Sequence, residues 1–385
     1  MSRLAQEELS ARSTAPKTPH MSRRLTPCCA LLFHVVMKNL HPLMLLCCVV
    51  AAVPTQAEGL AWKAVWEWSL PKKTEADLVR VADSAQSLGF NAILMAPPTP
   101  LIGFMRDQCH ERGMKLYYST VFAGGDKAWR QVMSPEEQAR AAQPVEKLHM
   151  SGGEPVLAGE VFRSPLPCYN RPEVREYFRK KVIGNAALPV DGLAFDYTGY
   201  ENYRRCYCPV CEATLAAYRK QHPRVAAKDA ERIVFEQILV DFTNEMAATA
   251  REARPGLELT VHIYPWFAPD PYWGHRTDID YVGQTVSWFF RPHWPLQEVR
   301  ERTAALVRDQ HLCYRQHSAA PFVAFDARKI RDYRAPERVA ADLRVVKESG
   351  ATALQMAELG YVLAEPKVAE AVARELGGSY RAEAR

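Results

Sequence analysis

The sequence predicts an α/β protein, a single (β/α)8 TIM barrel with a long loop excursion after strand 3. Three observations support this fold. From residue 60 on, eight short runs of β-branched or aromatic residues alternate with amphipathic stretches, as in parallel sheets whose strands are joined by helices. Eight such units over about 320 residues match the size of a barrel. The first run continues into WEWSLPKK, whereas a doubly wound sheet requires a Gly-rich phosphate turn there.

The alternation places each element along the chain. We expect strands at approximately Trp62–Trp68, Asn91–Ala96, Met114–Val121, Gly192–Tyr197, Leu257–Tyr264, Tyr281–Trp288, Phe322–Phe325 and Thr352–Ala357. Helical patterns lie between them at 74–88, 101–112, 172–183, 208–253 with a break near Pro223, 295–311, 336–349 and 366–376. Gly89, Gly113 and Gly350 follow three of these patterns, and glycine is common directly after a helix. Residues 122–170 form the longest connection, and we expect them to cross the barrel mouth.

Residues 1–57 are predicted to be a leader with a secretory signal peptide, which leaves 58–385 as the barrel. Lys38 precedes the apolar run 43–53, and small or compact residues at Thr55 and Ala57 suit cleavage near Ala57. The run is shorter than the roughly 20 apolar residues of a membrane span, so we expect no stable membrane insertion after cleavage. An uncleaved anchor is the alternative. Translation is expected to begin at Met37 or Met21, and the protein to be secreted or periplasmic.

The charge distribution argues against nucleic-acid binding. The leader holds six Lys or Arg and two Asp or Glu, a net of +4 of the chain's +5, which leaves +1 for the mature part. The mature part also lacks a basic stripe or block, so no nucleic-acid partner is expected. We expect no organic cofactor either.

Strand parity selects the side chains that reach the barrel axis, because successive residues of a strand point to opposite faces. In strand 4, Leu193 and Phe195 should face helices, which leaves Gly192, Ala194 and Asp196 inward. The same reasoning points Asp326 inward after strand 7, and Thr260, His262 and Tyr264 inward in strand 5. Asp196, Asp326 and His262 then share the C-terminal end, where barrel enzymes carry out chemistry.

Two carboxylates across a pocket are the requirement for hydrolysis of a glycosidic bond. Asp196 and Asp326 are the first candidate catalytic pair. Glu358, which follows strand 8 with outward parity, and Glu67, at the end of strand 1, are rivals for the second role. Each acid has a structural alternative as a helix N-cap or hydrogen-bond acceptor.

Aromatic side chains near the strand ends favour a carbohydrate substrate, since their faces stack on sugar rings. The tryptophans there are Trp66, Trp68, Trp266, Trp273, Trp288 and Trp294. Trp66 and Trp288 are expected to be core residues. Candidate substrate-binding residues are therefore Trp68, Trp266 and Trp273, together with His262 and Tyr264. His262 has an equal alternative as a buried, hydrogen-bonded core histidine.

Cys206, Cys208 and Cys211 form a C-x-C-x-x-C cluster, and Cys168 lies upstream in the same sector of the barrel. Four thiolates suit a tetrahedral structural Zn2+, which is the predicted cofactor. One disulfide plus two free thiols is the alternative. Cys109 and Cys313 are expected to be buried small hydrophobes.

The segment CYCPVCEATLAAYRKQHP resembles the zinc-cluster segment of glycoside hydrolase family 42 β-galactosidases, in which a C-x-C-x-x-C also follows strand 4 with a further cysteine upstream. More loosely, the unit from Cys168 through DGLAFDYTGY to the cluster resembles uncharacterised secreted glycosidase-like barrels. The resemblance covers about 55 of the 385 residues. It implies the barrel fold, a glycosidase activity and Cys168, Cys206, Cys208 and Cys211 as metal ligands.

The chain departs from that family at strand 4. Family 42 enzymes carry Asn-Glu there, with Glu as acid/base, whereas this chain has Asp196 between Phe195 and Tyr197. An aspartate at this position is similar to the nucleophile of α-galactosidase-type barrels. In strand 7, Asp326 stands where family 42 has a glutamate nucleophile.

These observations lead to one main hypothesis, a secreted glycoside hydrolase acting on an oligo- or polysaccharide through a carboxylate pair. A non-catalytic carbohydrate-binding barrel is the alternative from another class. A metal-dependent hydrolase is third, because no H-x-H or comparable ligand set lies near strand 1.

Overall fold

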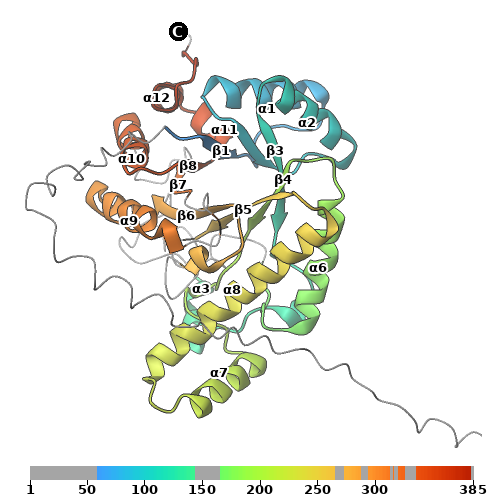
Figure 1. Ribbon diagram of the computed structural model, residues 1–385, viewed down its shortest axis with the longest axis vertical. Coiled ribbons are helices and arrows are strands. Elements are labelled where there is room, and N and C mark those ends of the chain that lie inside the picture. The colour runs from blue at the N-terminus through green and yellow to red at the C-terminus, as the bar shows by residue number, and fades with distance from the viewer. Residues whose placement is uncertain are drawn as a thin grey trace, which may run out of the picture. The chain divides into compact units, whose positions relative to one another are not determined.

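A computed structural model describes residues 59–143, 165–264, 273–287, 294–312, 315, 320–325 and 335–382. Its eight parallel strands form a closed barrel in the order β1 to β8, and β8 pairs with β1 (Figure 1). The single (β/α)8 barrel predicted from the sequence is confirmed. The predicted leader, Asp326, Trp266, Trp288 and Cys313 lie outside the described residues.

All eight predicted strands are confirmed, with no end displaced by more than two residues. They are β1 (Trp62–Trp66), β2 (Ala92–Met95), β3 (Lys115–Val121), β4 (Gly192–Asp196), β5 (Glu258–Ile263), β6 (Tyr281–Ser287), β7 (Phe322–Ala324) and β8 (Ala353–Ala357). Most of their residues are buried, because a barrel strand packs against the interior on one face and helices on the other.

The predicted helices are also present around the strands (Figure 1). They are α1 (Glu75–Ser87), α2 (Ile102–Glu111), α6 (Pro172–Ala186), α7 (Pro209–Gln221), α8 (Ala227–Ala253), α9 (Leu296–Arg308), α10 (Pro336–Glu348) and α12 (Pro366–Leu376). Local sequence explains several starts: Thr74 and Asp77 form a capping box at α1, and proline occupies the first turn of α6, α7, α10 and α12. The expected break near Pro223 separates α7 from α8.

Short elements escaped the sequence prediction. These are α3 (Pro135–Ala141), α11 (Leu359–Leu363) and the 3-10 turns η1 (Thr99–Leu101), η2 (Lys127–Trp129) and η3 (Trp273–Arg276). A further 3-10 turn, η4 (Asp309–Leu312), forms the end of the helical pattern predicted at 295–311. One or two turns are too short to show a helical period. The elements η2 and α3 belong to the connection between β3 and α6, which confirms a long excursion after strand 3.

Inward side chains fill the barrel interior and hydrogen-bond one another. The Trp62 indole N–H donates to Tyr117 Oη at 3.1 Å, and the Trp66 indole N–H donates to Gln355 Oε1 at 3.0 Å. Trp62 also stacks on Tyr281, with ring centroids 3.9 Å apart. On the outer face Phe195 packs against Phe122, as its parity predicts. The interior is therefore a packed core below the strand ends.

Glycines make room for the largest of these side chains. A Cβ added to Gly192 would collide with the Tyr117 ring and the Glu258 carbonyl oxygen. A Cβ added to Gly283 would collide in the same way with the amide of Gln355. The interior therefore pairs a large side chain on one strand with glycine on another.

Within the part of the chain that the structure describes, no helix has both the length and the apolarity needed to span a bilayer.

We predict that Gly192→Ala lowers the free energy of unfolding by about 1–3 kcal/mol, because overpacking a rigid interior strains its neighbours. Gly184→Ala is the matched control, since Gly184 lies in α6 and its added Cβ meets nothing within 4 Å. There the substitution should stabilise by about 0.5–1 kcal/mol. Urea unfolding monitored by tryptophan fluorescence measures both. Equal stability of Gly192→Ala and the wild type would contradict this account of the interior.

Candidate functional site at the C-terminal ends of the strands

Asp196 ends β4 and lies at the C-terminal end of the barrel, 7% exposed. Its Oδ1 accepts a hydrogen bond from the Tyr197 backbone N–H at 2.8 Å and lies 3.4 Å from His262 Nδ1. The Tyr264 hydroxyl also hydrogen-bonds to Asp196. The structure thus brings Asp196, His262 and Tyr264 together at the ends of β4 and β5.

The backbone directly after Asp196 is held in an uncommon conformation. Tyr197 has φ 67°, in the left-handed region that bulky residues rarely adopt. The buried Tyr169 hydroxyl donates to the Tyr197 carbonyl oxygen and lies 2.9 Å from that of Phe122. Such conformations cost about 1–3 kcal/mol and persist where their surroundings impose them. Tyr169 thereby fixes the turn that presents the Asp196 carboxyl.

His262 is buried among aromatic rings and two polar partners. Its ring stacks on Phe322 at 3.8 Å and lies 4.2 Å from Tyr264 and 6.2 Å from Trp66. Its Nε2 lies 3.2 Å from Thr285 Oγ1. Burial lowers the pKa of His262 below its usual 6.5, and Asp196 opposes that shift only in part. Burial therefore favours the neutral form of His262.

The predicted stacking tryptophans differ in exposure. Trp68, just beyond β1, is 42% exposed, and its ring lies 6.5 Å from Trp66. Trp273 is fully buried in η3 and presents no open face. Tyr264 is 5% exposed, and burial, with a smaller contribution from Asp196, raises its pKa well above the usual value.

Glu67 lies beyond the end of β1, in an ion pair. Its carboxylate accepts from Lys72 Nζ at 2.6 Å and from the Leu70 backbone N–H. Burial raises the pKa of Glu67; Lys72 counteracts the shift, and the nearby Glu358 adds to it. Glu67 and Glu358 are therefore neighbours at the β1–β8 side of the barrel.

Glu358 is fully buried and caps α11. Its oxygens accept from the backbone N–H groups of Gly360 at 3.1 Å and Tyr361 at 2.8 Å, and from the Ser69 hydroxyl at 2.8 Å. The backbone N–H of Trp68 lies 3.3 Å from the same carboxylate. Glu358 thus fixes the loop that carries the exposed tryptophan.

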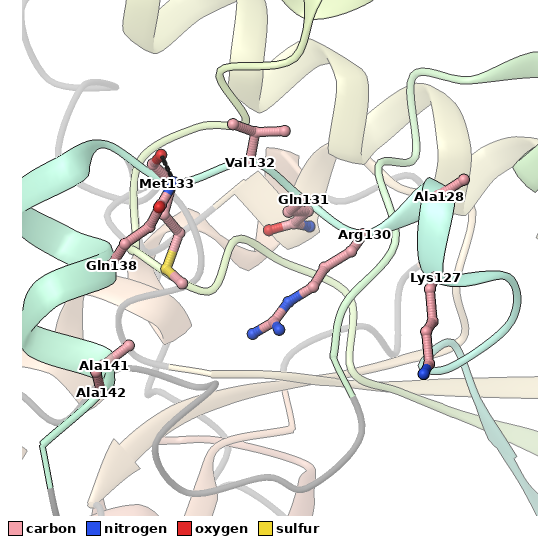
Figure 2. A pocket seen from close by; sticks show the side chains of 9 residues that line it. All are labelled: Lys127, Ala128, Arg130, Gln131, Val132, Met133, Gln138, Ala141 and Ala142. Carbon is pink, nitrogen blue, oxygen red and sulfur yellow. Dashed lines mark hydrogen bonds between the residues drawn. The ribbon is translucent and has the colours of Figure 1, made fainter.

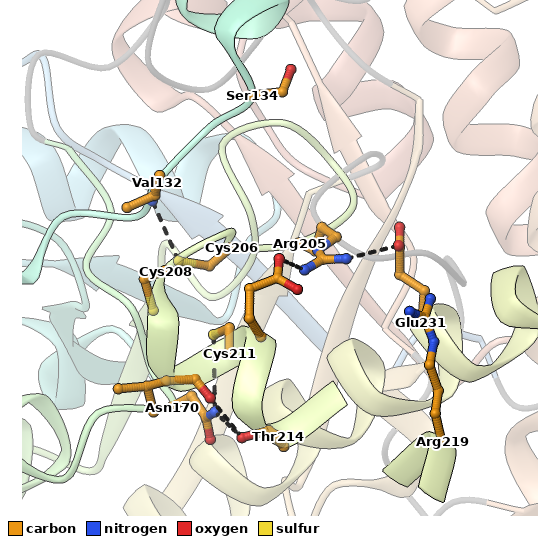
Figure 3. Close-up of polar contacts among 12 residues, drawn as sticks. Val132, Ser134, Asn170, Arg205, Cys206, Cys208, Cys211, Thr214, Arg219 and Glu231 are labelled. Atoms are coloured by element: carbon orange, nitrogen blue, oxygen red, sulfur yellow. Dashed lines mark hydrogen bonds and ion pairs between the residues drawn. The ribbon is translucent and has the colours of Figure 1, made fainter. Parts of the chain in front are cut away.

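The four predicted metal ligands form one buried cluster, with sulfurs within 4.8 Å of one another. Figure 3 shows three of them, Cys206, Cys208 and Cys211. Cys168 Sγ lies 3.5 Å from Cys208 Sγ and 3.4 Å from Cys211 Sγ. All four are free thiols, because a disulfide requires about 2.05 Å. Tetrahedral Zn–S bonds of about 2.3 Å place sulfurs roughly 3.8 Å apart, so the donor set fits a metal of this kind.

Donors around the cluster complement thiolate sulfurs. The Val132 backbone N–H points at Cys206 Sγ at 3.3 Å, and Asn170 Nδ2 lies 3.9 Å from Cys211 Sγ (Figure 3). Hydrogen bonding from Cys168 and the other thiols lowers the pKa of Cys208. The cluster joins the excursion after β3, the segment before α6 and the loop after β4.

Arg205 anchors the same loop to α8. Its buried guanidinium pairs with Glu231 at 2.9 Å (Figure 3). It also pairs with Glu212 and lies 4.7 Å from the centre of the Phe235 ring. Burial of this charge is compensated by two carboxylates and an aromatic face. The loop that follows Asp196 is thus fastened at Arg205 as well as at the cysteines.

A pocket of about 500 Å3 lies between η2 and α3 (Figure 2). Arg130 and Gln131 line it and contact the loop after β4: Arg130 pairs with the buried Glu201 at 3.4 Å, and Gln131 Nε2 donates to the Gly199 carbonyl at 2.9 Å. Burial raises the pKa of Glu201. The pocket wall is therefore continuous with the segment that begins at Asp196.

Sequence reasoning missed several residues of this region. Thr285 shares the inward parity of Gly283 in β6, so the alternation used for β4 and β5 would have found it. Tyr169, Val132 and Arg205 carry no local pattern that predicts their contacts. They come from separate loops that only the folded chain brings together. Cys109 is buried as predicted.

No protein-family model matches the chain, and no curated protein matches it. Several solved structures have a similar fold. The glycoside hydrolase domain of PgaB (BpsB) from Bordetella bronchiseptica superposes with a TM-score of 0.54 at 12% identity, over 82% of this chain and 98% of that domain. The β-galactosidase from Rahnella sp. R3 gives 0.51 at 12%, over 84% and 56%. A variant of Gan42B, a GH42 β-galactosidase from G. stearothermophilus, gives 0.51 at 11%, over 84% and 58%.

The chain spans nearly all of the PgaB domain but little more than half of these β-galactosidases. At such identities the similarity establishes the fold. The protein has a glycoside-hydrolase-like TIM barrel that resembles family 42.

Proposed function

We propose that the protein is a glycoside hydrolase that acts on an oligo- or polysaccharide through carboxylates at the C-terminal end of the barrel. One observation supports this most strongly. Of the three candidate acids within the described residues, Asp196 is the one at an inward strand position, where it meets His262 and Tyr264. The likeness to glycoside hydrolase barrels, including a complete PgaB domain, favours the same reaction class.

Asp196 is assigned the role of nucleophile or general base. The Tyr197 backbone N–H and the Tyr264 hydroxyl hydrogen-bond to its carboxyl group and so fix the orientation that either role requires. Asp326 is the proposed second carboxylate, on the strength of its parity with the inward-facing Phe322.

Two other acids compete for the role of general acid. Burial raises the pKa of Glu67, which suits proton donation, although Lys72 already holds one of its oxygens. Glu358 has a weaker claim, because backbone N–H groups and Ser69 occupy both of its oxygens.

Trp68 is the proposed stacking platform for a sugar ring, because its exposed indole stands at the end of β1 beside Trp66. Tyr264 and His262 are proposed to line the floor of the site. Trp266 is proposed as a second stacking residue from its position in the sequence. Trp273 is fully buried and could stack on a sugar ring only if it became exposed.

The cysteine cluster is proposed to bind a structural Zn2+. Cys168, Cys206, Cys208 and Cys211 would supply all four ligands, which leaves no open position for a substrate. Its contribution would be stability of the loops beside Asp196. The proposed secretion rests on the predicted leader alone.

Asp196→Asn should lower kcat/KM by about 10²–10⁴-fold in hydrolysis of a panel of aryl glycosides and oligosaccharides, because the amide cannot act as base or nucleophile. Asp241→Asn is the matched control, an exposed aspartate on α8 that hydrogen-bonds only locally to Gln237. It should retain full activity. Unchanged turnover in Asp196→Asn would refute this mechanism. Glycan binding without turnover by the wild type would instead indicate a carbohydrate-binding barrel.

Purified protein should contain one zinc per chain by elemental analysis, and Cys211→Ser should lose most of it, since tetrahedral zinc requires four ligands. Cys109→Ser is the control, because Cys109 is buried elsewhere and should leave the metal content unchanged. Thiol titration under denaturing conditions adds a second measurement. Zinc-free protein with two thiols missing would establish a disulfide.

Expression with export in a bacterial host should yield a mature N-terminus near Ala57, because the small residues around it suit signal peptidase. N-terminal sequencing of the exported protein measures this directly. Retention of the intact leader in the membrane fraction would favour an uncleaved anchor.

A further inference from the structure

We propose that Thr285 is a positioning residue that fixes neutral His262 with its proton on Nε2, so that the unprotonated Nδ1 faces Asp196 and takes up a proton there as the pH falls. The inference deepens the proposed function, since it assigns the proton acceptor beside the proposed catalytic carboxylate. The three residues whose protons it assigns, Asp196, His262 and Thr285, lie in β4, β5 and β6.

The hydrogen bonds of Thr285 determine the direction. Its Oγ1 lies 2.7 Å from the Ile263 carbonyl oxygen, which can only accept, so the single hydroxyl proton points there. The same oxygen lies 3.2 Å from His262 Nε2. Because the Thr285 hydroxyl donates its one proton to the Ile263 carbonyl oxygen, Thr285 Oγ1 can only accept a hydrogen bond from the His262 ring. Nε2 of His262 must therefore carry the proton.

The other side of the ring is consistent with that assignment. A neutral imidazole has one proton, so Nδ1 is bare where it faces Asp196 Oδ1. The two atoms are 3.4 Å apart, whereas a charge-assisted N–H···O bond is about 2.7–2.9 Å long.

Protonation would convert this contact into an attraction. A proton on Nδ1 makes the ring a double donor, to Asp196 on one side and Thr285 on the other. Among the described residues, Asp196 and Tyr264 are the titratable groups that face the ring, and Trp66 and Phe322 enclose it without titrating.

The experiment is a long-range ¹H–¹⁵N correlation spectrum of the full chain with ¹⁵N-labelled histidine, followed from pH 8 to pH 5. The spectrum of His262→Gln identifies the resonances of His262. At pH 8 the wild type should show Nδ1 at the shift of an unprotonated nitrogen and Nε2 at that of a protonated one. On acidification, Nδ1 should move to the protonated position.

Thr285→Val removes the acceptor at nearly constant volume, and the proton should move to Nδ1, where Asp196 accepts it. Thr285→Ser should restore the wild-type spectrum. Thr303→Val is the matched control, because Thr303 is a buried threonine whose hydroxyl bonds only within α9. A wild-type ring protonated on Nδ1 at pH 8 would overturn the proposal, as would a Thr285→Val spectrum identical to that of the wild type.

The spectra do not depend on turnover, so they test the tautomer even if no glycoside is hydrolysed. Where hydrolysis is measurable, Thr285→Val should shift the acid limb of the kcat/KM profile, and Thr303→Val should leave it in place. If Thr285→Val changes the tautomer of His262 but leaves the acid limb of the kcat/KM profile in place, His262 takes no part in catalysis.

Discussion

Closure of the barrel is the constraint on which the rest of the structure depends. Eight parallel strands that meet without an edge leave every strand hydrogen-bonded on both sides, and they enclose an interior of fixed width. The interior is filled to that width because a large side chain on one strand packs against a glycine on another, as Tyr117 does against Gly192 and Gln355 against Gly283. The rigid floor produced in this way holds Asp196 and His262 at the ends of neighbouring strands.

The alternation of strands was the most predictable part of the fold. Every strand was located from its apolar run, because burial on both faces leaves a continuous hydrophobic signal. Parity then placed Asp196, His262 and Tyr264 on one side of β4 and β5. The same alternation was not applied to β6, where it would have pointed Thr285 inward. Elements of one or two turns, such as α3 and α11, leave no periodic signal and were missed.

The surroundings of the site were less predictable than its strand positions. The exposure of a residue depends on which segments cover it. Trp68 and Trp273 were predicted from the sequence to have the same stacking role, yet Trp68 is exposed and Trp273 is fully buried. Glu358 and Glu67 follow strands, as candidate acids should. Glu358 nevertheless caps α11, the structural alternative that the sequence left open, and Glu67 pairs with Lys72 in the loop after β1. Three ligands of the cysteine cluster, Cys206, Cys208 and Cys211, were predictable because their spacing is a local property of the chain, and Cys168 was added from its place in the same sector of the barrel.

The four thiols of the cluster can come together only after a defined part of the chain has been synthesised. Cys168 is separated from Cys206, Cys208 and Cys211 by α6 and β4, so a long stretch must be made before the set is complete. An exported chain would meet oxidants while these sulfurs are still apart, and adjacent thiols could then be lost to mispairing. If the cluster binds the proposed Zn2+ and the chain is exported as proposed, metal binding and thiol oxidation would compete during folding until α6, β4 and α7 bring the four sulfurs together.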